Sequence, residues 1–162
     1  MNRLTISATD GSWLAGLTDG EGTFKLHTTP RGKYVQREIG FKIELRDDDT
    51  KALNLIQELL GCGTVVFHER KKPKVKAKPM ATFKSCSLAD LAEIIVPLFS
   101  AYPLQTKKAR EFEIWKHIVL TRYHDTSSAT VHRKYSEAYC LAFDSAYDQL
   151  DSLRKYEGRI TM

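Results

Sequence analysis

Two stretches near the start of the chain alternate apolar and polar residues, and this alternation predicts β-strands. Successive side chains of a strand point to opposite faces, so a period of two indicates one buried and one exposed face. In the second stretch one face collects only apolar side chains, namely Ile39, Phe41, Ile43 and Leu45. The predicted strands span residues 23–28 and 37–46, with a turn at residues 30–33.

Apolar residues spaced three and four apart predict helices in much of the rest of the chain. The helix at residues 47–60 begins with three aspartates, where the helix dipole favours acids, and Gly61 ends it. The sequence also predicts helices and strands in the order helix 13–22, strand 64–69, strand 79–86, helix 89–99, helix 104–122 and helix 133–156. The resulting order is αββαββα followed by C-terminal helices, an α+β fold. At 162 residues, the chain is expected to be one domain over residues 1–162.

The helix at residues 13–22, with the sequence WLAGLTDGEG, ends in two acids set between glycines. The C-terminal end of a helix carries partial negative charge, so an acid there costs roughly 0.3–1 kcal/mol unless a cation offsets it. Small residues four apart line one face of this helix and would let a second helix backbone come close. These small residues are Ser12, Gly16 and Gly20, and the opposite side offers Trp13, Leu14 and Leu17 to a core. An ordinary amphipathic helix with a glycine C-cap would also satisfy the pattern.

The segment WLAGLTDGEG resembles the LAGLIDADG motif of homing endonucleases. Six letters match, Glu21 replaces the second Asp, Gly20 replaces Ala, and Thr18 is the one polar departure. The resemblance implies that the motif helix lies at a twofold or pseudo-twofold axis. It also implies that Glu21, helped by the carbonyl of Gly20, holds a divalent metal, Mg²⁺ or Mn²⁺, in a DNA-cutting site. Asp19 is expected to cap or orient the helix junction.

The order of elements resembles the same family over roughly residues 10–120, which implies a four-stranded antiparallel sheet that binds DNA. Only one copy of the motif is present, since the nearest second candidate, residues 141–144, lacks the glycines and the following acid. Family members with one motif work as homodimers. The resemblance therefore implies a homodimer with Ser12, Gly16 and Gly20 in the interface and one Glu21 from each subunit at its base.

Charge and composition agree with a nucleic-acid partner but do not prove one. The net charge of +5 favours a polyanionic partner, and the resemblance implies that this partner is double-stranded DNA. The three cysteines are scattered, without zinc-ligand spacing, and are expected to be reduced. No leader peptide or membrane-spanning run is recognisable, so an intracellular, non-secreted protein is expected. The five histidines show no metal-binding pattern, so a histidine-metal nuclease is unsupported.

Polar side chains on the outer face of the predicted strands are the candidates for DNA contact. A β-ribbon fits the major groove, where Lys and Arg contact phosphate or guanine and Gln, Thr, His and Glu can read base edges. Any antiparallel sheet with one wet face would show the same pattern, and Val66 and Phe67 leave the parity of the second strand pair open. The candidates are Lys25, His27, Thr29, Arg31, Lys33, Gln36, Glu38, Lys42, Glu44, His68, Arg70, Thr82 and Lys84. In the basic run at residues 70–78 we expect non-specific phosphate contacts from Lys72, Lys74 and Lys76.

The resemblance also implies an active-site lysine near residues 104–108, where Lys107 and Lys108 both qualify and Lys107 is preferred. Leu45 stands where a polar, water-positioning residue is expected, so that role passes to Arg46 or Glu44 or is absent. The predicted reaction is metal-assisted hydrolysis of one phosphodiester per subunit, on a long, roughly palindromic site, with a cut staggered across the minor groove. Three alternatives stay open: an intron RNA-binding maturase on the same scaffold, a non-catalytic DNA-binding protein, and an unrelated basic RNA-binding or structural protein.

Overall fold

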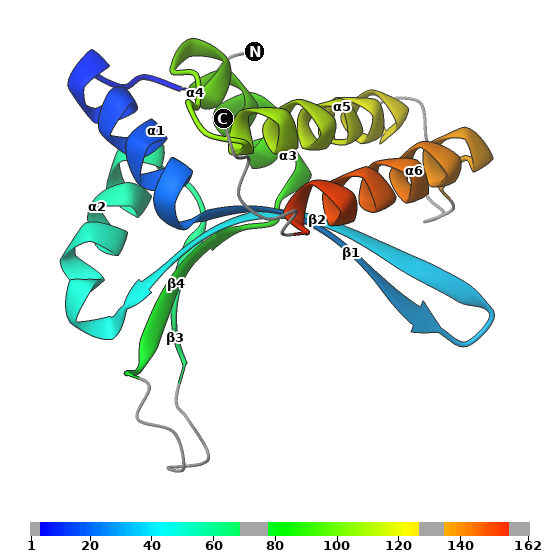
Figure 1. Cartoon of the computed structure of the whole chain (residues 1–162), viewed down its shortest axis with the longest axis horizontal. Helices are drawn as coiled ribbons and strands as arrows, with labels where there is room; N and C mark the ends of the chain where they lie inside the picture. Colours follow the sequence, from blue (N-terminus) through cyan, green and yellow to red (C-terminus); the bar gives the residue numbers. More distant parts are fainter. Residues whose placement is uncertain (1–3, 69–77, 127–134, 156–162) are drawn as a thin grey trace, which may run out of the picture.

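One antiparallel sheet organises the fold, with its strands in the order β1-β2-β4-β3. The computed structural model describes residues 4–68, 78–126 and 135–155. The strands are β1 (Gly22–Arg31), β2 (Tyr34–Arg46), β3 (Thr64–His68) and β4 (Met80–Ser85). The helices lie on one side of the sheet (Figure 1). They are α1 (Ala8–Glu21), the 3-10 turn η1 (Asp47–Asp49), α2 (Thr50–Leu60), α3 (Leu88–Asp90), the π-helical turn η2 (Leu91–Ile95), α4 (Val96–Ala101), α5 (Lys108–Thr126) and α6 (Glu137–Arg154).

The predicted α+β order of elements is confirmed, and the main differences lie at element ends. The motif helix begins earlier than predicted, because the Ser7 side chain accepts a hydrogen bond from the Asp10 backbone N–H at 3.1 Å and caps it. Helix α5 begins at Lys108 instead of residue 104, since residues 103–106 form a loop against the motif helix. The helix predicted at residues 89–99 is helical throughout but contains the π turn η2.

An aromatic cluster holds the helices to the sheet. Phe24 of β1 is completely buried, and its ring centroid lies 5.1–5.7 Å from four other rings. Those rings come from β2, α4 and α5 and belong to Phe41, Phe99, Phe112 and Trp115. Tilted and edge-on aromatic pairs add to the free energy of burial itself. The apolar side chains of β1 therefore pack against α4 and α5, and its polar side chains point away from the helices.

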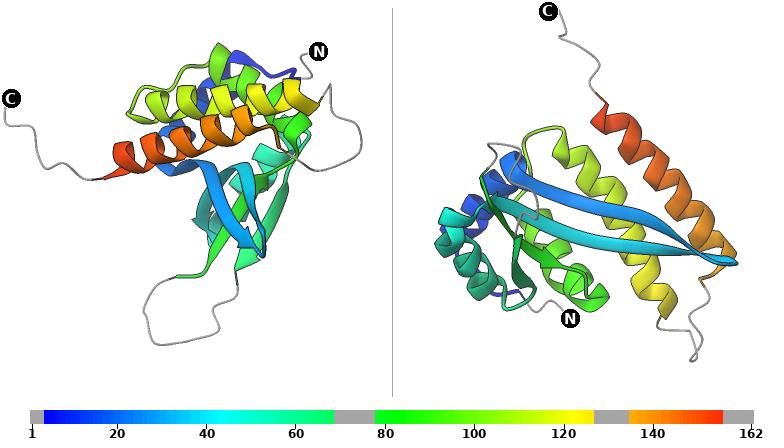
Figure 2. Two further views of the ribbon diagram at one scale, coloured as in Figure 1. Left: turned by 90° about the vertical axis from the view of Figure 1, so that its right-hand side faces the viewer. Right: turned by 90° about the horizontal axis from the view of Figure 1, so that it is seen from below.

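In the part of the chain that the structure describes, no helix lies over the opposite face of the sheet (Figure 1). The β1–β2 hairpin and the β3–β4 pair extend past the helices in different directions, so the sheet forms an arch (Figure 1). Seen from below, β1 and β2 run as a long ribbon under α5 and α6 (Figure 2). This arch leaves a concave surface, made by four strands, open along its length.

Helix α6 packs beside α5 and also binds the outer half of the hairpin. The Arg37 guanidinium donates to both carboxylate oxygens of Asp144 at 3.0 and 2.8 Å, and the Tyr135 hydroxyl donates to the Arg37 carbonyl at 3.2 Å. The Arg37 side chain therefore lies on the helix side of β2 and not on the open face. Within the described ranges, every helix is too short or too polar to cross a bilayer.

Candidate functional site

The motif helix ends at Glu21, with its carboxylate on the exposed surface. The last turn of α1 holds no basic residue, so the partial negative charge of the helix end must be offset from elsewhere. Lys108, the first residue of α5, supplies the cation: its Nζ donates to the carbonyls of Thr18 at 3.1 Å and Gly20 at 3.2 Å. Burial lowers the pKa of Lys108, and the negative charges of Glu111, Glu21 and Asp19 partly oppose that change.

Lys107, the residue preferred from the sequence, is arranged differently. Its side chain is exposed, and its carbonyl accepts from the N–H groups of Arg110 at 3.0 Å and Glu111 at 3.4 Å at the start of α5. Of the two lysines, only Lys108 donates to the end of the motif helix among the described hydrogen bonds.

Asp19 also connects the same two helices, but here the side chain comes from α1 and its hydrogen-bond partners come from the segment just before α5. Its carboxylate accepts from the backbone N–H groups of Gln105 at 2.8 Å and Thr106 at 3.0 Å, and from the Thr106 hydroxyl at 2.6 Å. Burial alone would raise the pKa of Asp19, but these hydrogen bonds, with the charge of Lys108, lower it. The sequence analysis missed Gln105 and Thr106. A threonine just before a helix start is a common capping signal that could have pointed to Thr106.

The stripe of small residues lies on the outside of α1. Ser12, Gly16 and Gly20 are exposed, and a Cβ atom added to either glycine would meet nothing within 4 Å. The buried side of α1 instead carries Gly11, Leu14, Ala15 and Thr18. The sequence analysis wrongly assigned Trp13 to the core, because its side chain is 37% exposed and borders the outer face. The single chain therefore presents a flat, unfilled helix face ending at Glu21.

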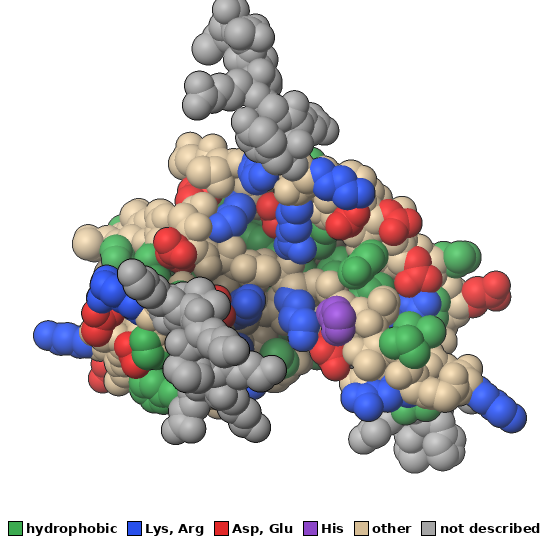
Figure 3. Space-filling model, turned by 60° about the horizontal axis from the view of Figure 1, so that its bottom comes forward, with side chains coloured by type: hydrophobic (Ala, Val, Ile, Leu, Met, Phe, Trp, Pro, Cys, Tyr) green, Lys and Arg blue, Asp and Glu red, His purple; other side chains and the backbone are tan. Residues whose placement is uncertain are grey.

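The register of the sheet places the predicted polar residues of the strands on the open face. Lys42 lies opposite Lys84, Glu44 opposite Thr82, and His27 opposite Glu38. The parity that the sequence left open is resolved, because Val66 pairs with Thr82 and His68 lies two residues further on the same face. Lys and Arg side chains gather across the middle of this face, with acidic side chains and a histidine between them (Figure 3).

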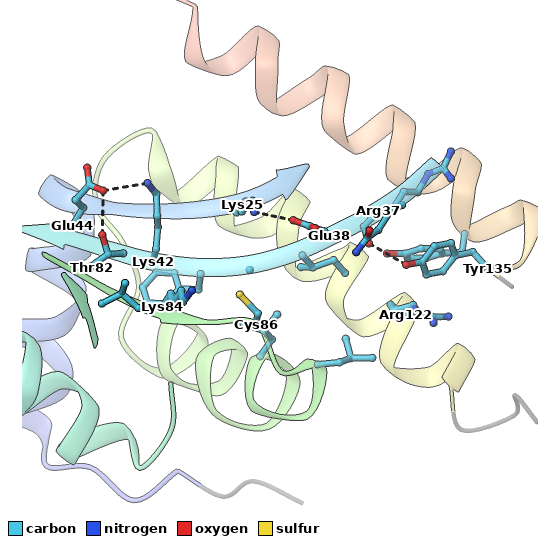
Figure 4. Close-up of a pocket in the computed structure, with 18 of the residues that line it drawn as sticks. Lys25, Arg37, Glu38, Lys42, Glu44, Thr82, Lys84, Cys86, Arg122 and Tyr135 are labelled. Carbon is cyan, nitrogen blue, oxygen red and sulfur yellow. Dashed lines mark hydrogen bonds and ion pairs between the residues drawn. The ribbon is translucent and has the colours of Figure 1, made fainter. Parts of the chain in front are cut away.

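Hydrogen bonds between side chains hold part of this face in place (Figure 4). Lys25 Nζ donates to Glu38 at 3.0 Å, and the Thr82 hydroxyl donates to Glu44 at 3.1 Å. His68 Nε2 lies 2.9 Å from the same Thr82 oxygen. These groups line part of a hollow of about 700 Å³, which also reaches Arg37, Arg122 and Tyr135 on the helix side. They therefore offer both donors and acceptors in fixed positions, which is what reading base edges requires.

The remaining predicted contacts lie on the outer hairpin or outside the described residues. Thr29, Arg31, Lys33 and Gln36 follow the hairpin toward its turn, where Arg31 Nε donates to Gln36 at 3.1 Å. Arg70, Lys72, Lys74 and Lys76 fall outside the described residues. The sequence analysis missed Cys86, which follows β4 and lines the hollow beside Gly40.

The oxygen atoms at the end of α1 are suitable ligands for a hard divalent cation. Among the described residues no group of three His, Cys, Asp or Glu side chains could enclose a metal. The Glu21 carboxylate is exposed, and the Gly20 carbonyl is beside it in the chain. Mg²⁺ prefers oxygen ligands and is commonly held by one or two carboxylates together with substrate phosphates. A single chain thus supplies part of such a site and leaves the rest to a substrate or a second chain.

Comparison with known proteins agrees with this geometry. A family model described as LAGLIDADG endonuclease matches residues 14–119, a range that includes Glu21, the whole sheet and Lys108. The chain belongs to the LAGLIDADG endonuclease family. The probable intron-encoded endonuclease 3 of Neurospora crassa is 30% identical over 108 residues, which cover 65% of this chain and 19% of that protein.

Solved structures share the fold. The LAGLIDADG homing endonuclease I-GzeII in complex with its DNA target superposes with a TM-score of 0.72 at 22% identity, covering 93% of this chain and 47% of that one. I-SmaMI, bound to uncleaved DNA target in the presence of calcium ions, superposes with a TM-score of 0.71 at 19% identity, covering 91% and 46%. The present chain thus spans about half the length of these two structures and about a fifth of the Neurospora protein.

We predict that Asp19→Asn lowers the free energy of unfolding at neutral pH by about 1 kcal/mol, because a neutral amide replaces the carboxylate that accepts three hydrogen bonds from Gln105 and Thr106. The folded pKa of Asp19 lies below its ordinary value of 3.8, so its contribution is full above that value and disappears as the pH falls through the folded pKa. Urea unfolding of both proteins between pH 7 and pH 2.5 measures this difference. A difference in unfolding free energy between the two proteins that stays constant with pH would contradict this role of the Asp19 carboxylate.

Proposed function

We propose that the protein is a site-specific endonuclease that hydrolyses both strands of double-stranded DNA, acting as a homodimer with Mg²⁺ or Mn²⁺. One observation carries the proposal: the exposed stripe of Ser12, Gly16 and Gly20 ends at the exposed carboxylate of Glu21. Two chains packed along this stripe would bring two Glu21 side chains to the same end. Each sheet would then present its arch to one half of a long, roughly palindromic DNA site.

The residues at the end of α1 divide the work in this proposal. Glu21 and the Gly20 carbonyl would hold the divalent ion, which when bound supplies charge stabilisation at the phosphate and the leaving 3′ oxygen. Two Glu21 carboxylates brought near each other would repel, and a cation between or beside them would offset that repulsion. Lys108, held on the Gly20 carbonyl, carries positive charge to the same place and is assigned in preference to Lys107. Asp19 fixes the position of Lys108 by capping the helix that carries it.

The sheet supplies recognition in this proposal. Its arch presents side chains at a spacing of two along stiff strands, which keeps one row facing a groove. Glu44 and His68 are suited to reading bases, because the buried Thr82 hydroxyl between them holds both side chains in place. Lys33, exposed at the turn of the hairpin, is suited to a phosphate contact.

The first test replaces the proposed metal ligand. Incubation of the wild-type protein with a library of DNA sites and Mg²⁺, followed by sequencing of the ends, should recover a preferred site. On that site we expect Glu21→Gln to abolish cleavage and to leave DNA affinity in Ca²⁺ close to wild type. Glu58→Gln, which removes an exposed acid from α2, is the matched control and should cut normally. Substantial Mg²⁺-dependent cutting by Glu21→Gln would refute the assignment.

The second test concerns assembly. Gly16→Val adds bulk where nothing in the single chain interferes, so the monomer should fold, but the close helix contact should be lost. Overpacking a tight contact typically costs about 1–3 kcal/mol, so dimerisation should weaken roughly 5- to 150-fold. Ser145→Val, at an exposed position on α6 and away from the stripe, is the control. Sedimentation that finds the wild-type protein monomeric, alone and on DNA, would overturn the dimer.

The third test separates reading from positioning. His68→Ala frees Thr82 and should change the preference at particular base pairs, each worth roughly 1–3 kcal/mol of discrimination. Lys33→Ala should weaken binding equally on all sites and lower the salt slope by about one unit. Binding profiles on single-base variants of the site, at several salt concentrations, measure both. Equal, flat losses for the two variants would mean that the sheet does not read the sequence.

A further inference from the structure

A buried carboxylate lies one helical turn after Lys108. Glu111 of α5 is only 4% exposed, and a charge at that depth is costly unless it is paired. Arg154, the last residue of α6, pairs with it: Nε and Nη2 lie 2.9 and 2.8 Å from the same Glu111 oxygen. The Arg154 Nη2 also donates to the Phe24 carbonyl on the edge strand β1 at 2.6 Å. One guanidinium therefore connects α6, α5 and β1 beside the end of the motif helix.

Glu111 is a competitor for Lys108. The two residues are three apart on α5, a spacing at which oppositely charged side chains attract. Of the acids around Lys108, Glu111 is the one whose charge most raises the pKa of that lysine. Yet the Lys108 ammonium donates to the carbonyls of Thr18 and Gly20, while Glu111 is occupied by Arg154.

We infer that Arg154 is a positioning residue for the site at the end of α1: it neutralises Glu111 and thereby leaves Lys108 on the Gly20 carbonyl. The inference rests on the proposed function for its catalytic meaning. Arg154 lies beyond residues 14–119, the part that matches the family model, so this connection belongs to the C-terminal helix of this chain. Helix α6 then acts on the site through charge as well as through packing.

A double-mutant cycle tests this role. Arg154→Met leaves Glu111 buried without its partner, Glu111→Leu removes the competitor, and the double variant replaces the pair by apolar side chains, which buried sites often tolerate. Lys155→Met, one residue further along, removes the same charge from an exposed pair with Asp151 and is the control. The measurements are the single-turnover cleavage rate with Mg²⁺ on saturating target, the DNA affinity in Ca²⁺ and the melting temperature.

We expect Arg154→Met to cut about 10- to 100-fold more slowly, the usual effect of losing a residue that orients a metal site, with DNA affinity near wild type. Glu111→Leu, the double variant and Lys155→Met should cut at close to the wild-type rate. Recovery in the double variant separates this role from simple support of α6, which both substitutions would weaken. If Arg154→Met does not fold, the double variant decides alone. A double variant that folds but cuts slowly, slow cutting by Glu111→Leu, or normal cutting by Arg154→Met would overturn the inference.

A wild-type protein that cuts no DNA would instead refute the proposed function, and the inference would still be testable. Crystal structures of the wild-type and Arg154→Met proteins then give the answer. We expect the Lys108 ammonium on the Gly20 carbonyl in the first and on the Glu111 carboxylate in the second. If the Lys108 ammonium stays on the Gly20 carbonyl in the Arg154→Met protein, the inference is overturned.

Discussion

The reciprocal connection between the end of α1 and the start of α5 is the constraint on which the site depends. A lysine from α5 satisfies the carbonyls that α1 leaves open, and an aspartate from α1 satisfies the N–H groups that precede α5. Each helix end carries the partial charge that its partner's side chain opposes. The polar groups at both helix ends are therefore hydrogen-bonded. Among the described contacts of the last turn of α1, the Glu21 carboxylate makes no hydrogen bond or ion pair. It is therefore available to bind a ligand.

The aromatic cluster gives that connection a fixed base. Phe24 lies three residues after Glu21, the end of the motif helix, and contacts rings from α4 and α5. The position of the motif helix relative to the sheet is therefore set by packing on one side of β1. The other side of the same strand carries Lys25 and His27 on the open face. In the proposed function, recognition and chemistry would thus share one short segment, in which alternate residues face the core and the surface.

Much of this could be predicted from the sequence because it depends on local patterns. The alternation in β1 and β2 identified the open face, and the motif identified the helix end with its acids and small residues. The choice between Lys107 and Lys108 could not be made, because it depends on where α5 begins. That start is set by Asp19, 86 and 87 residues away from its partners Gln105 and Thr106. The partner of Glu111 could not be predicted from the sequence either, since Arg154 lies 43 residues further along the chain. Trp13 was misplaced because a pattern of small and large residues does not show which side of a helix faces the sheet.

On the outer face of α1, a Cβ atom added at Gly16 or Gly20 would meet no atom of the described chain within 4 Å. If the proposed dimer forms, its folding and its assembly would therefore be separate events with separate requirements. In the proposed dimer, dilution would leave a folded but incomplete enzyme, because half of each active site would be missing. The amount of assembled enzyme would then rise with roughly the square of the protein concentration when the protein is scarce. Because of this steep dependence, a low concentration of the protein would give very little cleavage of genomic DNA.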